Sequence, residues 1–171
     1  NQSTLIGSSA VSASGNAGSI NINTKAMTVT GGALISSSTF GSGNAGSINI
    51  NASERLSIDG FGFNSTTNQV EYTTVRTGGI LLPESIQQRF GLPPTVTGNA
   101  GTLTINTPSL QIENQALVTV RHDSLGNAGK IEVDADSVIL NGEGKITATT
   151  ASGEGGNINL NLKSDLILRN N

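Results

Sequence analysis

The chain has 171 residues, with nine Lys and Arg against twelve Asp and Glu, and no cysteine. Because the basic residues are few and singly scattered, a nucleic-acid partner is excluded, and the lack of cysteine excludes a disulfide framework and a thiolate metal site. No apolar run approaches the length that spans a bilayer. The N-terminus has no basic segment followed by an apolar one, so we expect no signal peptide within the sequence.

A pattern of turn and strand, first seen as GNAGSININ, occurs five times along the chain. The starting glycines are 28, 55, 28 and 27 residues apart, so one interval is nearly doubled. A period in this range is typical of solenoids and other repeat arrays, and it predicts one domain over residues 1–171. The copies begin at Gly15, Gly43, Gly98, Gly126 and Gly153.

Each repeat contains three short segments with the features of strands. The first follows the glycine turn and alternates Ile20 and Ile22 with polar residues. The second carries Met27 and Val29 and ends at a turn of Gly, Asn or Asp, and the third is residues 33–35. None of these strands can bury its apolar face within one repeat, so we predict that equivalent strands stack in parallel, about 4.8 Å apart.

Stacking predicts an all-β fold, a right-handed parallel β-helix of about 28 residues and three strands per coil, with one irregular insertion. Both ends of the chain match the middle of a repeat. We therefore expect a segment of a longer repeat protein, or neighbouring copies that cover its ends. Two inward columns are predicted: Ile20, Ile48, Leu103, Ile131 and Ile158 in one, and Ile22, Ile50, Ile105, Val133 and Leu160 in the other.

One polar position recurs five residues after the last glycine of each turn. Stacked side-chain amides can donate and accept hydrogen bonds along the stack, which predicts a structural ladder at a corner of each coil. The glycines of the turns are predicted to supply positive φ or close approach at another corner, and no phosphate-binding pattern is present. The ladder residues are Asn23, Asn51, Asn106, Asp134 and Asn161.

The doubled interval contains an insertion, residues 61–97, which holds four of the five aromatic residues and three of the four prolines. In one interpretation it forms a third strand and an irregular extra coil, with Val75 or residues 80–82 entering the core and the aromatic side chains packed together over the surface. In the other it is an exposed adhesive or contact loop whose rings stack on sugar or on a neighbouring chain. The aromatic residues are Phe61, Phe63, Tyr72 and Phe90.

Few residues are candidates for catalysis. His122, the only histidine, lies beside Asp123 and is predicted to be a surface residue in a variable turn. The acidic pairs of Glu132 with Asp134 and of Asp134 with Asp136 are interpreted as solvated charges. We therefore predict no catalytic residue, no cofactor and no metal site.

The GNAG-x-I-x-I-N units, the intervening Leu-x-Ile-x-Gly segments and the richness in Asn, Ser and Gly resemble the repeat region of filamentous haemagglutinin-like exoproteins, especially the cyanobacterial ones. The resemblance covers nearly all of the chain apart from the insertion. It implies a right-handed parallel β-helix, two-partner secretion through an outer-membrane transporter, and a location on the extracellular cell surface. The family's N-terminal secretion domain is not visible in this sequence, and the fifth copy departs from the pattern at Glu154 and Gly155.

The expected function is non-enzymatic. We expect a structural shaft or adhesin scaffold of a secreted exoprotein, which mediates adhesion or forms a surface fibre, with a glycan or another cell-surface ligand as partner. A carbohydrate-active β-helix enzyme of the polysaccharide lyase or hydrolase type is one alternative, which requires acids from adjacent coils to gather in a groove. An extracellular filament subunit that stacks end to end is the other.

Overall fold

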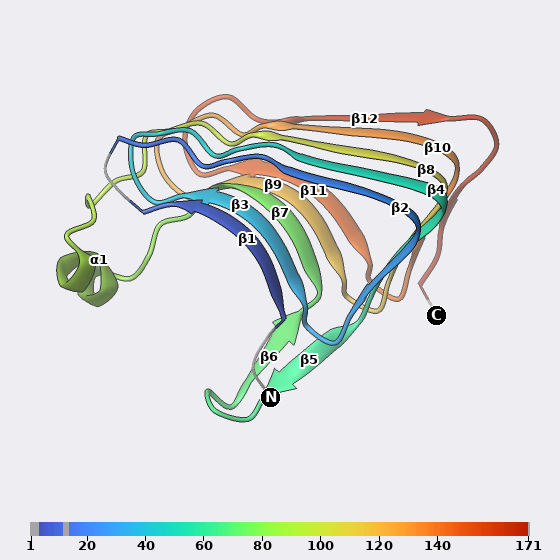
Figure 1. Cartoon of the computed structure of the whole chain (residues 1–171), viewed down its shortest axis with the longest axis horizontal. Helices are drawn as coiled ribbons and strands as arrows, with labels where there is room; N and C mark the ends of the chain where they lie inside the picture. The colour runs from blue at the N-terminus through green and yellow to red at the C-terminus, as the bar shows by residue number, and fades with distance from the viewer. Residues whose placement is uncertain (1–3, 12–13, 171) are drawn as a thin grey trace.

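The computed structural model describes residues 4–11 and 14–170, and this part of the chain is mostly β-strand with one short helix (Figure 1). The alternation of apolar and polar residues found in the sequence is the reason, since it suits strands with one buried face. In chain order the elements are β1 (Leu5–Ala10), β2 (Ile20–Thr30), β3 (Leu34–Thr39), β4 (Ile48–Asp59), β5 (Phe61–Asn64), β6 (Gln69–Tyr72), β7 (Thr74–Gly79), α1 (Glu84–Phe90), β8 (Thr102–Glu113), β9 (Leu117–His122), β10 (Lys130–Asn141), β11 (Lys145–Thr150), β12 (Asn157–Leu162) and β13 (Leu166–Leu168).

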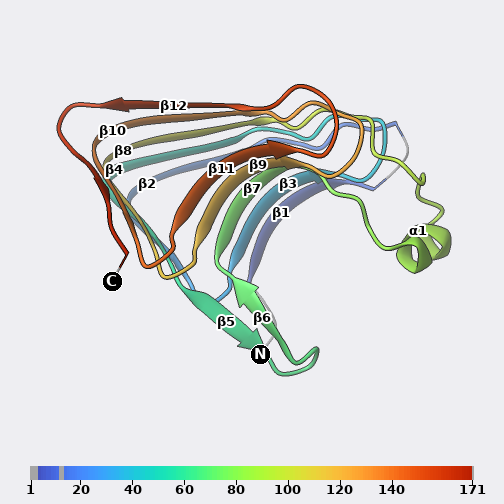
Figure 2. The ribbon, with the colours of Figure 1, turned by 180° about the vertical axis from the view of Figure 1, so that it is seen from behind.

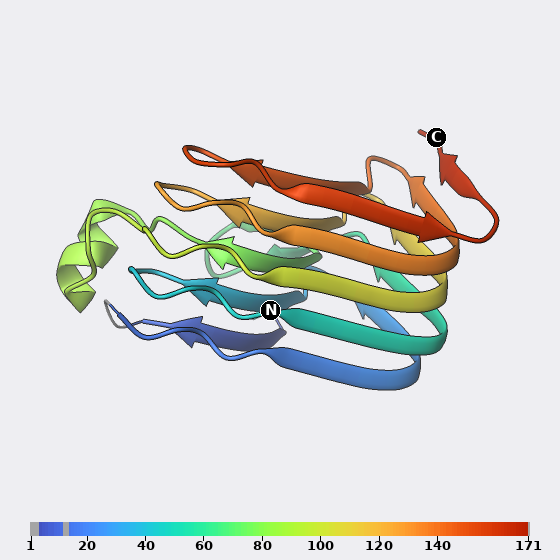
Figure 3. The same ribbon diagram turned by 90° about the horizontal axis from the view of Figure 1, so that it is seen from above.

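The strands form two parallel sheets and one antiparallel hairpin. A five-stranded sheet has the order β1-β3-β7-β9-β11, and a six-stranded sheet has the order β12-β10-β8-β4-β2, with β13 paired to β10 beside β12. Neighbours in each sheet are equivalent strands of successive repeats, so the repeats lie on top of one another (Figure 3). The chain therefore has an all-β fold with parallel sheets.

The pairing register matches the two predicted columns. Ile48 pairs with Ile20 on one side and with Leu103 on the other, and the same order continues to Ile131 and Ile158. The central members of both columns are fully buried, whereas Ile158, on the outermost strand β12, is 41% exposed. Each buried aliphatic side chain stabilises the fold by about 1.5 to 3 kcal/mol, so the columns are a substantial part of the apolar core. The rest of the core comes from the second half of the long strands and from the five-stranded sheet.

The prediction of three separate strands per repeat is wrong for the complete repeats. The first two predicted strands are one long strand in β2, β4, β8 and β10, and this strand bends partway along (Figures 1 and 2). The register shifts between Thr24 and Ala26 in β2 and between Asn51 and Leu56 in β4. The strand continues through the bend because its neighbours bend at the same place, which keeps most of the ladder hydrogen bonds.

Close approach, rather than positive φ, is the reason for the glycines of the repeat turns. Among the described glycines of the four GNAG turns, none has φ in the left-handed region. A Cβ at Gly101 would lie 2.2 Å from the carbonyl oxygen of Gly46, and one at Gly129 would lie 1.8 Å from that of Gly101. The backbones of successive turns touch, and only glycine fits between them.

The region 61–97 contributes one strand to the five-stranded sheet and leaves two separate excursions. The hairpin β5–β6 comes first, then β7 inserts between β3 and β9, and residues 80–97 with α1 follow. Val75 on β7 is fully buried in the core, whereas residues 80–82 are half-buried or exposed. The helix ends at Gly91, whose φ of 64° is in the left-handed region.

Candidate functional site

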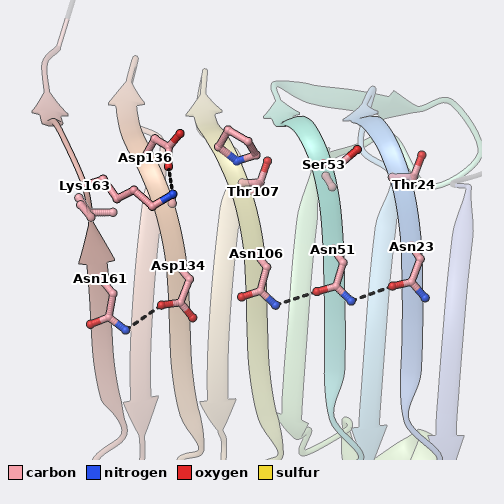
Figure 4. Close-up of a pocket in the computed structure, with 14 residues that line it drawn as sticks. Asn23, Thr24, Asn51, Ser53, Asn106, Thr107, Asp134, Asp136, Asn161 and Lys163 are labelled. Carbon is pink, nitrogen blue, oxygen red and sulfur yellow. Dashed lines mark hydrogen bonds and ion pairs between the residues drawn. The ribbon is translucent and has the colours of Figure 1, made fainter.

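The five predicted ladder residues lie in one row along a groove of about 900 Å³ at the bend of the long strands (Figure 4). The Nδ2 of Asn51 donates to the Oδ1 of Asn23 at 2.8 Å, and the Nδ2 of Asn106 donates to the Oδ1 of Asn51 at 2.7 Å. Further along, Asn161 donates to the Oδ1 of Asp134 at 2.9 Å. In every case the donor belongs to the later repeat.

The row is interrupted at Asp134. The Nδ2 of Asn106 donates to Asn51, so the Oδ1 of Asn106 faces Asp134 (Figure 4). The carboxylate of Asp134 is also an acceptor. Among the hydrogen bonds of the described residues, none joins Asn106 to Asp134, because two acceptors face each other there. The row therefore consists of a run of three asparagines followed by a separate pair.

Replacing Asp134→Asn should stabilise the protein by about 1 kcal/mol, because the new amide can donate to Asn106 while its oxygen still accepts from Asn161. Urea unfolding at neutral pH would measure the difference. Asp136→Asn is the matched control, since it removes the same charge two residues away and loses only the exposed ion pair with Lys163. Equal stability of the two variants would contradict the view that a hydrogen bond is missing between Asn106 and Asp134.

A second row of asparagines, which was not predicted from the sequence, lies in the repeat turns. The side-chain Oδ1 of Asn16 accepts the backbone N–H of Asn44 at 2.7 Å, and the same contact recurs through each later turn. The last of these bonds runs from the N–H of Glu154 to Asn127, so the glutamate supplies only a backbone group and its side chain is free to vary. The recurrence of Asn at the second position of GNAG is the signal that points to this row.

The aromatic residues of the region 61–97 do not form one cluster. Phe61 and Phe63 on β5 pair across the hairpin with Tyr72 and Val70 on β6, which places these four side chains on one face. The rings of Phe61 and Tyr72 meet edge to face with centroids 6.3 Å apart. All four side chains are about half exposed.

Phe90 lies apart from this face, on α1 at the other end of the five-stranded sheet (Figure 1). Its ring is 60% exposed and lies under the guanidinium of Arg89, 5.6 Å from the ring centroid. The expectation that the aromatic side chains pack together is therefore wrong for Phe90. The physical reason is β7, which returns the chain to the sheet between the hairpin and the helix.

The prediction that His122 is a surface residue is also wrong, since it is 1% exposed. Its Nε2 bonds to the carbonyl oxygen of Gly98 at 2.6 Å, and its Nδ1 accepts the backbone N–H groups of Ser124 and Gly126. This pattern requires the proton on Nε2. Gly79 and Gly126 leave the room that the ring fills, because a Cβ on either would lie within 2.4 Å of Nε2.

Replacing His122→Ala should cost about 3 kcal/mol, because it leaves the carbonyl of Gly98 and two N–H groups without their partner in a buried place. His122→Thr should recover part of this loss. The reason is that Thr150, which pairs with His122 in the sheet, bonds to the carbonyl of Gly126 in the same way at 3.0 Å. Thermal unfolding of both variants would show the order, and an alanine variant as stable as the parent would contradict the role.

The acidic pairs near the row are engaged in single contacts. Glu132 forms an ion pair with Lys130, and Asp136 forms one with Lys163 at 2.8 Å, whose hydrogen bond raises the pKa of Lys163. Within residues 4–11 and 14–170, no group of three or more His, Asp or Glu side chains is placed to hold a metal ion. In the same part of the chain, no helix has the length and apolar character needed to cross a membrane.

A hollow of about 500 Å³ lies against the five-stranded sheet and the β5–β6 hairpin, and both cations and acids line it. Arg76 on β7, Arg121 on β9 and Lys145 on β11 are the cations that line it, and Glu71 and Glu143 are the acids. Tyr72 lines the same hollow from the hairpin side.

Searches against protein-family models, curated proteins and solved structures found no match for this chain.

Proposed function

We propose that the chain is a shaft segment of a secreted, cell-surface exoprotein of the filamentous haemagglutinin type, folded as a right-handed parallel β-helix. The observation that carries this proposal is the in-register pairing of successive repeats. The same positions face one another in five repeats, and the pairing passes from β3 through β7 to β9 although two excursions flank β7. A structure of this kind extends by adding equivalent units, which suits a long scaffold.

The shaft proposal expects tolerance to the removal of one whole repeat. Deleting residues 99–126 joins Gly98 to Asn127, recreates a GNAG turn and places β4 against β10. This variant should fold with the same far-ultraviolet circular dichroism per residue and with lower thermal stability, because one set of interfaces is lost. Deleting residues 99–112, half as many, breaks the register and should prevent folding. Failure of the whole-repeat deletion to fold would overturn the proposal.

The apolar face of the β5–β6 hairpin is the part of this scaffold that we assign to adhesion. Phe61, Phe63, Val70 and Tyr72 are held about half exposed on a hairpin that projects from the stack (Figures 1 and 2). Function concentrates on loops that a rigid scaffold positions. Phe90 on α1 is a second exposed aromatic contact, separate from this face.

Removal of the hairpin tests this assignment without disturbing the sheets. The backbone N–H of Thr73 bonds to the carbonyl of Gly60 at 3.0 Å, so a Gly-Gly turn can replace residues 61–72. The shortened protein should keep its melting temperature and lose binding on glycan arrays and to cell surfaces. The Phe90→Ser variant should keep the binding that depends on the hairpin. Unchanged binding by the shortened protein would move the adhesive site elsewhere.

A further inference from the structure

The hollow on the five-stranded sheet lies on the face that points away from the core. Val75 and Thr77 of β7 are buried towards the core, and Arg76 between them points the opposite way, as strand alternation requires. Arg76 lies between Ser36 of β3 and Thr119 of β9 in the pairing register. Figure 1 shows this sheet curving between the hairpin at one end and α1 at the other.

Arg76 is a half-buried cation without a carboxylate partner. Its Nε donates to the Oγ of Ser36 at 3.3 Å, and among the ion pairs of the described residues none includes it. The nearby acid Asp123 is already bound by Arg121 through both oxygens. Burial, followed by the charge of Arg121, lowers the pKa of Arg76, and Asp123 opposes this effect.

A guanidinium withdrawn from water is normally paired, because its desolvation is unfavourable unless an anion compensates it. Among the ion pairs of the described residues none supplies that anion, and Arg76 lines the hollow. The planar fork of guanidinium matches a carboxylate through two parallel hydrogen bonds. The missing partner is therefore best supplied by a carboxylate from outside the chain.

The other walls define what carries that carboxylate. The ring of Tyr72 is half exposed at the hairpin side and offers a flat apolar face against which the C–H face of a sugar ring can pack. Glu143 and Gln115 also line the hollow, and they offer an acceptor and an amide suited to hydroxyl groups. The carboxylate of Glu71 already accepts from the Nδ2 of Asn64.

We propose that this hollow binds a saccharide that carries a carboxylate group, with the carboxylate on Arg76 and the sugar ring against Tyr72. Such uronic acid units occur in extracellular polysaccharides, so the ligand class is an acidic polysaccharide. The site does not depend on the shaft function, but it shares Tyr72 with the hairpin face that we assign to adhesion and in that respect rests on the proposed function. Its residues come from β7, the hairpin and the turns that flank the sheet, whereas the shaft rests on the buried columns.

Isothermal titration of the intact chain with tetragalacturonate tests the proposal. The fully methyl-esterified tetramer is the matched neutral ligand, and sodium acetate tests whether a free carboxylate suffices. Arg76→Gln removes the cation, and Tyr72→Leu removes the ring face. Arg55→Gln is the control, since it removes the same charge from an exposed position on β4 in the other sheet.

We expect the acidic tetramer to bind at least tenfold more tightly than its ester and than acetate. Arg76→Gln should lose at least tenfold in affinity and Tyr72→Leu several-fold, with melting temperatures unchanged, whereas Arg55→Gln should bind as the parent does. Equal losses in Arg76→Gln and Arg55→Gln would show attraction by overall charge and overturn the site. The proposal would also be overturned if none of the tetragalacturonate, alginate and hyaluronan tetramers, titrated in the same way, bound to the chain.

Discussion

Replacing Gly129→Ala should destabilise the protein by about 3 kcal/mol or more, the upper end of the cost of overpacking. The added methyl would lie 1.8 Å from the carbonyl oxygen of Gly101, which is a backbone atom held in the turn of the preceding repeat. Neither turn can yield without breaking the contacts between Asn99 and Asn127 on the same side. The midpoint of urea unfolding would measure the loss.

Gly155→Ala is the matched control for this experiment. Gly155 occupies the same turn of the next repeat, but a Cβ built on it meets no atom within 4 Å. Its backbone is outside the left-handed region, so alanine should leave stability unchanged or raise it by up to about 1 kcal/mol. If both alanine variants unfold at the parent's midpoint, close approach between turns is not what requires glycine.

Replacing Ile105→Asp should abolish cooperative folding. Ile105 is fully buried between Ile50 on β4 and Val133 on β10, so the carboxylate would be surrounded by aliphatic side chains with no partner. An unpaired buried charge costs several kcal/mol beyond the lost apolar burial, which together approach the whole stability of a domain this size. Circular dichroism during heating would show no sharp transition.

Gln111→Asp provides the comparison on the same strand. The Gln111 side chain alternates with the buried Leu110 and Ile112 and faces outward, so the same new charge stays in water. Its expected cost is below about 1 kcal/mol, the range of strand preference. Similar losses in Ile105→Asp and Gln111→Asp would contradict the assignment of the column.

Recurrence made the columns and the ladder row predictable, because a position that returns in five repeats with one chemical character reveals its environment. The interruption at Asp134 was not predicted, since it depends on which way each amide is turned. His122 was misjudged because its burial depends on Gly79 and on the carbonyl oxygen of Gly98, both of which are distant in the sequence. The unpaired state of Arg76 likewise depends on Asp123 being engaged by another arginine.

The continuity of each bent strand was missed for a different reason. A change of apolar phase near Thr24 indicates a corner, and a corner in one chain usually ends a strand. Here the neighbouring strands turn together, so the pairing survives a change of direction that a single strand would not. The sequence did not decide which part of the region 61–97 enters the core, because both Val75 and residues 80–82 are apolar.

In the described part of the chain, the hydrogen bonds that join two side chains of successive repeats all run from the later repeat to the earlier one. Asn49, Asn51, Asn106 and Asn161 each donate to the repeat before, and the acids Asp59 and Asp134 serve only as acceptors for an asparagine of the repeat after. Each unit thus turns donating side chains towards the unit before it and accepting side chains towards the unit after it. A duplicated or deleted unit restores the same junction, so the length of the stack can change by recombination without a new interface having to evolve.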